Sequence, residues 1–443
     1  MSDTIAAIST PFGEGAVAML RLSGSEAIAV ADGVFRGSFR PSAAPSRLQL
    51  FGKIFDGTDM LDDVLLTVFR APASYTGEDV VEICCHGGIL VSRRILQLLF
   101  ERGAHPANPG EFTQRAFLNG KMDLTQAEAV MDLIRAQTSL ALRAAAGQLE
   151  GRLGKRIWEI REDLLGLLAH VEAYIDFPDE DIDPDTGAAL LGKLERVGET
   201  IESLLQTADQ GRILREGIRT VICGEPNVGK SSLLNLLLGY ERAIVSEIPG
   251  TTRDTIEEVI NLRGIPVRLV DTAGLRASSD SIEQQGMART LKHIETADLV
   301  LRVADGSRGN AGMESDAGKN EILVLNKCDL GLHESQRDVR AVRISCKTTE
   351  GLEALAEAIF TRVMGGHVNT GDFSAAINAR HQVCLQKALQ SSRDAGRAMR
   401  EALSAEFIAI ELHSALDAVG EVVGKADSEE LLGRIFSTFC IGK

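Results

Sequence analysis

One segment, GEPNVGKS at residues 224–231, constrains the fold of this chain more than any other. It has the Gly-x-x-x-x-Gly-Lys-Ser spacing of a phosphate-binding loop, with the β-type run RTVIC before it and an apolar helical run after it. In such a loop backbone N–H groups face phosphate oxygens, Lys230 neutralises the β- and γ-phosphates, and the Ser231 hydroxyl reaches Mg²⁺. We expect these residues to contact a nucleotide: Gly224, Asn227, Val228, Gly229, Lys230, Ser231 and Ser232.

Residues 216–368 alternate strand-like and helix-like segments, which predicts a doubly wound parallel sheet. The strand-like runs are RTVICG, VRLVDTAG, DLVLRVADG, EILVLNKCD and VRAVRISC. One of them ends in D-T-A-G, where Asp271 can support the Mg²⁺ shell and the Gly274 N–H can contact the γ-phosphate. We therefore add Asp271, Thr272, Ala273 and Gly274 to the expected nucleotide site.

The N-K-C-D motif at residues 326–329 predicts selectivity for guanine. The Asp329 carboxylate can accept hydrogen bonds from guanine N1–H and from the exocyclic amine, and adenine offers neither in that arrangement. Asn326 and Lys327 would brace the loop and the base. A weaker, later base contact is expected from S-C-K, which is Ser345, Cys346 and Lys347.

A segment between the phosphate loop and D-T-A-G, EIPGTTRDT, has the character of a γ-phosphate sensor. Thr252 is our candidate for the second hydroxyl on Mg²⁺, ordered only while the γ-phosphate is present. After Gly274 stands Leu275, where many GTPases carry a glutamine that orients water, so another group must do this work. The expected contacts of this segment are Ser246, Glu247, Ile248, Pro249, Gly250, Thr251 and Thr252.

Long amphipathic helices flank the α/β block on both sides, which predicts one helical domain with the α/β domain inserted into it. Apolar residues recur there at steps of three and four, and we expect these stripes to be core. The stripes are Leu149, Leu153, Ile157, Ile160, Leu164, Leu168 and Val171; Leu190, Leu194, Val197, Ile201 and Leu205; and Leu385, Leu389, Met399, Leu403, Ile410 and Leu416. A last helix is expected to begin at the N-cap candidate Asp427.

Residues 1–120 read as mixed α/β, with strand-like runs GAVAMLRLSG, DDVLLTVF and EDVVEICCHGG and a helix that ends at Gly103. The net charge of −16 disfavours broad binding to nucleic acid, although Arg93, Arg94 and Arg102 could form a local basic face. No apolar run is long enough to span a membrane. Seven scattered cysteines fit a reducing cytoplasm, and we expect neither a secretory signal nor a zinc site.

The order of phosphate loop, D-T-A-G and N-K-x-D resembles the GTPase superfamily. More specifically, the whole chain resembles the MnmE (TrmE) family of tRNA-modification GTPases. The resemblance rests on GEGAVAMLRLSG, SYTGEDVVEICCHGG, NPGEFTQRAFLNGKMDLTQAEAV, GEPNVGKSSLLN, IPGTTRDT and the final FCIGK. It implies a multidomain α/β plus α fold with a folate-binding dimerisation domain (1–120), a helical domain in two parts (121–215 and 369–443) and an inserted Ras-like G domain (216–368).

The resemblance also implies a function in tRNA. A homodimer formed through the N-terminal domain would join the flavoprotein MnmG, which carries FAD and uses NADH, in a heterotetramer. Together they would install an aminomethyl-type group at carbon 5 of wobble uridine, with 5-formyl- or methylene-tetrahydrofolate as the one-carbon donor. One alternative is a regulatory switch GTPase, for example in ribosome assembly, that does no chemistry on RNA. Another leaves residues 1–120 as a dimerisation unit alone.

Family positions map onto this sequence residue by residue. For a stimulating K⁺ they imply Asn227 through its side chain and Ser246, Ile248 and Thr251 through their backbone oxygens. Glu283 falls where the family orients the attacking water, although without the resemblance it would read as a surface acid. For folate the implied residues are Arg21, Glu82, Lys121 and Lys443.

Cys440 has three interpretations from the sequence. The spacing of FCIGK matches a prenylation box, but Gly442 and Lys443 fit that poorly. An idle cysteine is a second interpretation. The resemblance favours the third, a reactive thiol that acts in the modification chemistry beside the folate site.

Overall fold

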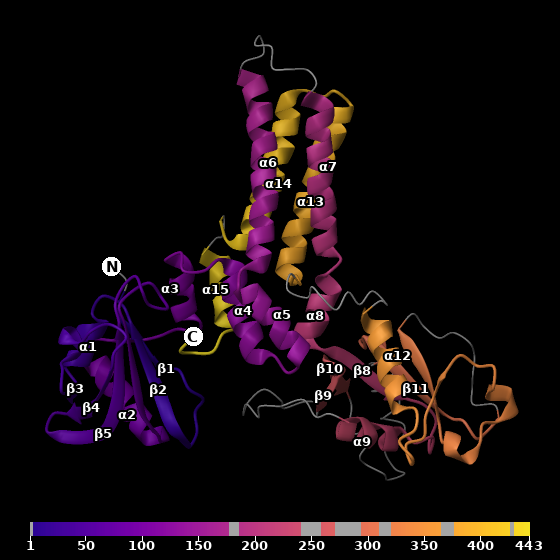
Figure 1. Cartoon of the computed structure of the whole chain (residues 1–443), viewed down its shortest axis with the longest axis horizontal. Helices are drawn as coiled ribbons and strands as arrows, with labels where there is room; N and C mark the ends of the chain where they lie inside the picture. The colour runs from indigo at the N-terminus through magenta and orange to yellow at the C-terminus, as the bar shows by residue number, and fades with distance from the viewer. Residues whose placement is uncertain are drawn as a thin grey trace. The chain divides into compact units, whose positions relative to one another are not determined.

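In the computed structural model the described residues are 3–176, 186–240, 258–270, 294–309, 320–364, 376–425 and 429–443. The chain forms two compact units (Figure 1). One combines Met1–Met131 with Leu416–Lys443, and the other comprises Asp132–Ala415. The first unit is therefore built from both ends of the sequence. This multidomain arrangement of mixed and helical parts confirms the predicted fold class.

The N-terminal unit contains a seven-stranded sheet in the order β3-β4-β5-β6-β2-β1-β7. All neighbouring strands are antiparallel except β1 and β7. The strands are β1 (Ile5–Ile8), β2 (Gly15–Ser23), β3 (Phe35–Gly37), β4 (Gln49–Asp56), β5 (Asp59–Phe69), β6 (Val80–Gly87) and β7 (His105–Pro106). The predicted runs correspond to β2, β5 and β6, whereas β1, β3, β4 and β7 were not predicted.

Two helices, α1 (Ala27–Asp32) and α2 (Ile89–Glu101), pack against this sheet, and a short 3₁₀ turn η1 (Pro41–Ala43) follows β3. Alternate residues of β2 and β6, such as Leu20 and Ile83, are fully buried with Ile95 of α2. Successive side chains of a strand point to opposite faces of the sheet, so every second residue lies on the face that these helices cover. Helix α2 ends just before Gly103, which has φ +103°, as the sequence predicted.

The end of the chain packs on helices that follow the N-terminal sheet. These are α3 (Glu111–Leu118) and α4 (Leu124–Arg135), and the chain returns through α14 (Ala405–Val423) to α15 (Glu429–Ser437). Phe436 and Phe439 share a buried cluster with Leu124 and Met131 of α4. Gly110 lies beneath them with φ +69°, and a Cβ there would be 2.8 Å from the Phe436 carbonyl oxygen. The predicted helix start at Asp427 lies outside the described residues.

The second unit begins with helices α5 (Ser139–Leu149), α6 (Arg152–Asp176), α7 (Thr186–Leu205) and α8 (Ala208–Glu216), and α13 (Ala379–Arg400) packs along α7. The predicted stripes of α6 and α7 are buried from Leu153 to Val171 and from Leu194 to Ile201. Gly151, with φ +82°, separates Leu149 from the rest of its stripe. Within the described helices, we find none whose length and apolar character would let it cross a bilayer.

The predicted third stripe is wrong at two positions, because Leu403 is 47% exposed and Ile410 is 61% exposed. Leu403 lies in the turn between α13 and α14 and so does not follow a helical period. Ile410 precedes the fully buried Leu412 by two residues, which is about 200° around a helix. The buried face of α14 instead runs through Leu412, Ala415 and Val419.

A six-stranded sheet follows in the order β13-β12-β11-β8-β10-β9. Its strands are β8 (Ile218–Cys223), β9 (Glu258–Leu262), β10 (Ile265–Val270), β11 (Leu299–Asp305), β12 (Glu321–Asn326) and β13 (Val342–Arg343), with helices α9 (Lys230–Tyr240) and α12 (Leu352–Met364) and the 3₁₀ turns η2 (Cys328–Leu330) and η3 (Glu334–Gln336). The five predicted strands are parallel, and β9 adds an antiparallel edge that was not predicted. Strand order reverses beside β8, which is where ligands bind in sheets of this kind.

Because one face of α14 is buried and the other exposed, substitutions at two nearby positions should change the free energy of unfolding by different amounts. Leu412→Ala removes a fully buried side chain and should lower the free energy of unfolding by about 2–5 kcal/mol. Ile410→Ala, on the exposed face of the same helix, should change it by no more than about 0.5 kcal/mol. Urea unfolding followed by the fluorescence of Trp158, the single tryptophan and a residue of α6, measures both. Equal losses in the two variants would contradict the assigned face.

Candidate functional site

The phosphate-binding loop connects β8 to α9 and has a backbone that depends on two glycines. Gly224 has φ +143°, and a Cβ there would lie 2.1 Å from the Val303 carbonyl oxygen. Gly229 has φ +100°, and its Cβ would lie 2.2 Å from Asn326 Nδ2. Asn227 between them is left-handed at φ +63°, a conformation that asparagine tolerates better than most residues. The loop therefore closes against β11 and the end of β12.

Lys230 opens α9, and its ammonium donates hydrogen bonds of 2.8 Å to the carbonyl oxygens of Gly224 and Glu225. The side chain thus lies back over its own loop. Ser231 and Ser232 are exposed on the first turn of the helix. The N-terminal end of a helix carries partial positive charge, so this turn favours an anion beside an exposed hydroxyl.

Asn326, at the end of β12, is 2% exposed and forms hydrogen bonds to the phosphate-binding loop and to the S-C-K loop. Its Nδ2 donates to the Val228 carbonyl oxygen at 2.9 Å, in the phosphate-binding loop. Its Oδ1 accepts from the Cys346 backbone N–H at 3.1 Å. Both ends of a buried amide are paired, so the end of β12 holds the phosphate loop and the S-C-K loop at fixed positions before any ligand arrives.

Lys327 makes a second link to the phosphate-binding loop. Its ammonium donates to the Asn227 carbonyl oxygen and to Asp305 Oδ2, both at 2.8 Å, while its own backbone is left-handed at φ +64°. Burial acts to raise the pKa of the Asp305 carboxyl, but hydrogen bonds from Lys327 and Ser307 lower that pKa below its ordinary value. The carboxylate is therefore charged beside the ammonium.

Asp305 was missed in the sequence prediction. The available signal was an acid at the carboxyl end of a strand-like run, in VADG, between the D-T-A-G and N-K-C-D motifs. Catalytic and binding groups of doubly wound sheets gather at such strand ends.

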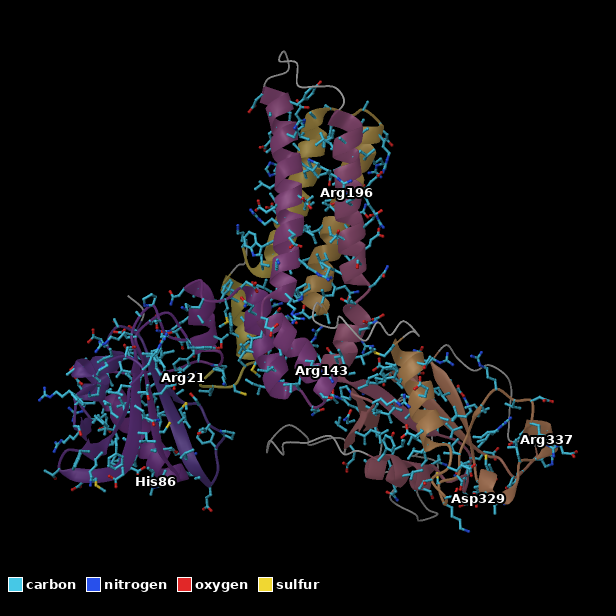
Figure 2. The ribbon with its side chains drawn as sticks, viewed as in Figure 1. Arg21, His86, Arg143, Arg196, Asp329 and Arg337 are labelled. Atoms are coloured by element: carbon cyan, nitrogen blue, oxygen red, sulfur yellow. The ribbon has the colours of Figure 1, made fainter. Side chains whose placement is uncertain are left out.

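Asp329, which Figure 2 labels, is exposed at the edge of the site. Ser345 Oγ donates to its Oδ1 at 2.7 Å. Ser345 is fully buried and its hydroxyl also accepts from the Thr348 backbone N–H. The Asp329 carboxylate is therefore oriented by a hydroxyl that is itself held in place. Burial raises the pKa of the Cys346 thiol to about 11, which keeps it protonated. Cys346 contributes its backbone N–H here, and Lys347 is exposed.

The remaining predicted residues of this site lie outside the described residues. They are Ser246, Glu247, Ile248, Pro249, Gly250, Thr251, Thr252, Asp271, Thr272, Ala273, Gly274 and Glu283. Their roles stay predictions. The structure brings together the other predicted contacts, from the phosphate loop, N-K-C-D and S-C-K, at one edge of the six-stranded sheet.

A second group of predicted residues meets on the N-terminal sheet. Arg21 of β2 pairs across the ladder with Glu82 of β6, and its Nη2 and Nε donate to Glu82 Oε1 at 2.8 and 3.0 Å. The guanidinium lies 5.4 Å from the ring centroid of Tyr75 and 5.8 Å from that of Phe112. Cation–π contacts of this kind stabilise a partly buried arginine.

The final residues of the chain reach this same place. Gly442 has φ +93°, and its carbonyl oxygen accepts from Ser9 Oγ at 3.1 Å and from Arg21 Nη1 at 3.5 Å. A Cβ on Gly442 would lie 2.6 Å from the Ile8 carbonyl oxygen, so only glycine fits. Cys440 is exposed beside this turn.

Lys443 follows Gly442 and is affected by the Arg21 charge. Burial and the nearby Arg21 guanidinium lower the pKa of the Lys443 ammonium from its ordinary value. The Arg21 charge opposes the charged form of Lys443, whereas the Glu82 carboxylate favours it. A carboxylate ligand would relieve the repulsion between the two cations.

The fourth residue predicted for folate, Lys121, is placed differently. Its ammonium donates to the Pro72 carbonyl oxygen at 2.9 Å, on the loop before β6. Among the described side chains, no hydrogen bond or ion pair joins Lys121 to Arg21, Glu82 or Lys443. The structure thus joins Arg21 to Glu82 directly and brings the chain end that carries Lys443 to Arg21 through the Gly442 carbonyl oxygen, whereas Lys121 bonds elsewhere.

Comparisons with known proteins cover the whole chain. The family model for the MnmE helical domain matches residues 124–440, and that for the GTP-binding protein TrmE N-terminus matches residues 4–121. The tRNA modification GTPase MnmE of Akkermansia muciniphila is 52% identical over 445 residues, covering 99% of each chain. That of Listeria welshimeri is 46% identical over 457 residues, covering 100% of this chain and 99% of the relative.

Among solved structures, the G domain of the T. maritima FeoB iron transporter matches with 29% sequence identity. It covers 33% of this chain and 98% of that chain, at a TM-score of 0.24. A score this low gives no information about how the present chain works.

Proposed function

The chain belongs to the MnmE family of tRNA modification GTPases, and we propose that it is a potassium-stimulated GTPase that modifies carbon 5 of wobble uridine in tRNA together with the flavoprotein MnmG. As a family member it binds GTP with Mg²⁺, hydrolyses GTP and acts in tRNA modification. The observation that carries the finer proposal is the meeting of Arg21, Glu82 and the chain end. A GTPase that acts only as a switch has no need of such a site.

We assign four segments to three domains. Residues 1–120 form the folate-binding and dimerisation domain, 121–215 and 369–443 form the two parts of the helical domain, and 216–368 form the G domain. Dimerisation through the N-terminal domain would yield a heterotetramer with MnmG. The scattered cysteines fit a reducing compartment, and we place the enzyme in the cytoplasm.

Nucleotide binding and specificity follow from chemistry at the sheet edge. Lys230 and the backbone of the phosphate loop bind the phosphates, and Asp329 selects guanine with its oriented carboxylate. The exposed Ser231 hydroxyl suits Mg²⁺, a hard cation that prefers oxygen ligands. Thr252 would supply the second hydroxyl once the γ-phosphate orders its segment.

A K⁺ ion would supply positive charge near the phosphates in the transition state, in place of an arginine finger. Asn227 fits this task, because its left-handed backbone is fixed by Lys327 and its side chain is exposed in the phosphate loop. Ser246, Ile248 and Thr251 would complete the shell through their backbone oxygens. Glu283 would orient the attacking water.

The residues around the chain end fit a reduced folate. Arg21 and Lys443 can bind the carboxylates of its glutamate tail, and both Arg21 hydrogen bonds to Glu82 go to Oε1, which leaves Oε2 to accept from a pterin edge. Bound folate would supply the one-carbon unit. Lys121 would have to leave the Pro72 carbonyl oxygen to take part. Cys440, exposed beside this site, would act as the reactive thiol.

Potassium dependence is tested at Asn227. We expect the wild-type GTPase rate to be much higher in KCl than in NaCl of equal ionic strength. Asn227→Ala should remove most of this selectivity, since the side-chain oxygen is lost, while GTP still binds. Steady-state phosphate release in each salt, with nucleotide binding measured in parallel, gives the answer. Matched wild-type rates in the two salts would reject the proposal.

The role of Cys440 is tested by Cys440→Ser in cells that otherwise lack this protein. We expect folding, dimerisation and GTP hydrolysis to remain near normal and tRNA modification to be abolished or sharply reduced. The physical reason is that an exposed thiol contributes little to packing, whereas a hydroxyl is a far weaker nucleophile. Nucleoside analysis of bulk tRNA is the measurement. Full modification would leave Cys440 idle, and loss of GTPase activity would mark it as structural.

A further inference from the structure

We propose that Asp305 is a positioning residue for the nucleotide site, which acts through Lys327 to hold the phosphate-binding loop in its binding conformation. Asp305 belongs to neither the phosphate loop nor the N-K-C-D motif. The inference rests on guanine-nucleotide binding at this site and adds a residue that determines its affinity.

Asp305 is the last residue of β11, and it pairs in the parallel ladder with Asn326, the last residue of β12. It is 5% exposed, yet each oxygen has a donor. Oδ1 accepts from the Ser307 backbone N–H at 3.0 Å and from Ser307 Oγ at 2.6 Å. Oδ2 accepts from Lys327 Nζ at 2.8 Å, and the exposed Arg308 Nε lies 3.7 Å from it. The local turn at Ser307 therefore fixes the carboxylate and points one oxygen at Lys327.

Lys327 transmits this constraint to the phosphate-binding loop. A lysine side chain loses much rotamer freedom when it is held in one conformation, so it needs fixed partners at its ammonium. Asp305 is the charged partner, and the Asn227 carbonyl oxygen is the other. Because Asp305 holds the Lys327 ammonium, the hydrogen bond from that ammonium to the Asn227 carbonyl oxygen keeps Asn227 in its left-handed conformation. The shape of the loop depends on this conformation.

The rest of the loop has its own supports, which makes the contribution of Asp305 separable. Asn326 holds Val228, and close packing on Val303 limits Gly224 to glycine. Loss of Asp305 should therefore leave the fold intact and loosen the loop at Asn227. The expected effect is on nucleotide affinity, and it should depend on Lys327 being present.

The experiment measures the affinity of the full-length protein for a fluorescent N-methylanthraniloyl derivative of GDP. Asp305→Asn keeps the shape of the side chain and removes its charge, and should raise the dissociation constant about tenfold, the usual weight of a hydrogen bond between charged groups. In the Lys327→Met background the same substitution should have less than about a twofold effect, because the two residues act as one unit. Ser307→Ala, which removes one donor to Asp305, should give a smaller increase of about threefold.

Asp298→Asn is the matched control. Asp298 precedes the opposite end of β11, where it accepts from the Arg219 backbone N–H at 2.9 Å and pairs with Arg212. This substitution should leave the dissociation constant unchanged even where it lowers the melting temperature. An affinity loss of the same size in the control would show a general effect of stability and overturn the proposal.

The results distinguish failure of the proposed role of Asp305 from failure of guanine-nucleotide binding itself. Absence of binding by the wild-type protein would refute guanine-nucleotide binding itself. Normal wild-type binding with unchanged affinity in Asp305→Asn, or an equal loss with and without Lys327, would overturn the role of Asp305. If Asp305→Asn does not fold, Ser307→Ala with and without Lys327 decides by the same criterion.

Discussion

The packing of the chain end on the N-terminal unit is the constraint on which the rest of the architecture depends. Phe436 and Phe439 fill a buried cluster over Gly110, and Gly442 fits against Ile8 where no side chain has room. Because both ends of the sequence build one unit, everything from Asp132 to Ala415 is an insertion in sequence. The same packing brings the final residues to Arg21.

The two sites of the chain are prepared for their ligands in different ways. The nucleotide site is tied together by a buried amide and by a lysine–aspartate pair, so the shape of the loop is set by hydrogen bonds within the protein. At the N-terminal site, burial and the charge of Arg21 instead lower the pKa of the Lys443 ammonium. The first site is shaped by bonds within the protein, whereas we propose that the second binds an anion.

Sequence patterns predicted the features that depend on local chemistry. The phosphate loop, N-K-C-D and the parallel strands follow from glycine conformation, polar residues at strand ends and apolar runs, and the structure places them together. Strands β1 and β9 were not predicted, because runs of four and five residues carry too little alternation of apolar and polar residues to identify a strand. Leu403 and Ile410 were assigned to the core because apolar spacing alone does not show where α13 ends.

Contacts between distant parts of the sequence account for the rest. Asp305 is 22 residues from Lys327, and Ser9 is 433 residues from Gly442, so neither pair shows in any local pattern. Lys121 is a further case. Its family position implies a folate contact, yet its ammonium bonds to the Pro72 carbonyl oxygen, 49 residues away, and a resemblance in sequence does not reveal such a partner.

We propose that the N-terminal site and the chain end deliver a one-carbon unit from folate to tRNA. Isotope tracing tests it most directly. Unmodified tRNA would be incubated with the full-length protein, MnmG, GTP, Mg²⁺, K⁺ and a tetrahydrofolate carrying ¹³C in its one-carbon group, and the wobble nucleoside analysed by mass spectrometry. We expect one ¹³C atom attached at carbon 5 of the uridine, and we expect the label to be lost when Lys443 is replaced by methionine. Modified uridine without the label would contradict it.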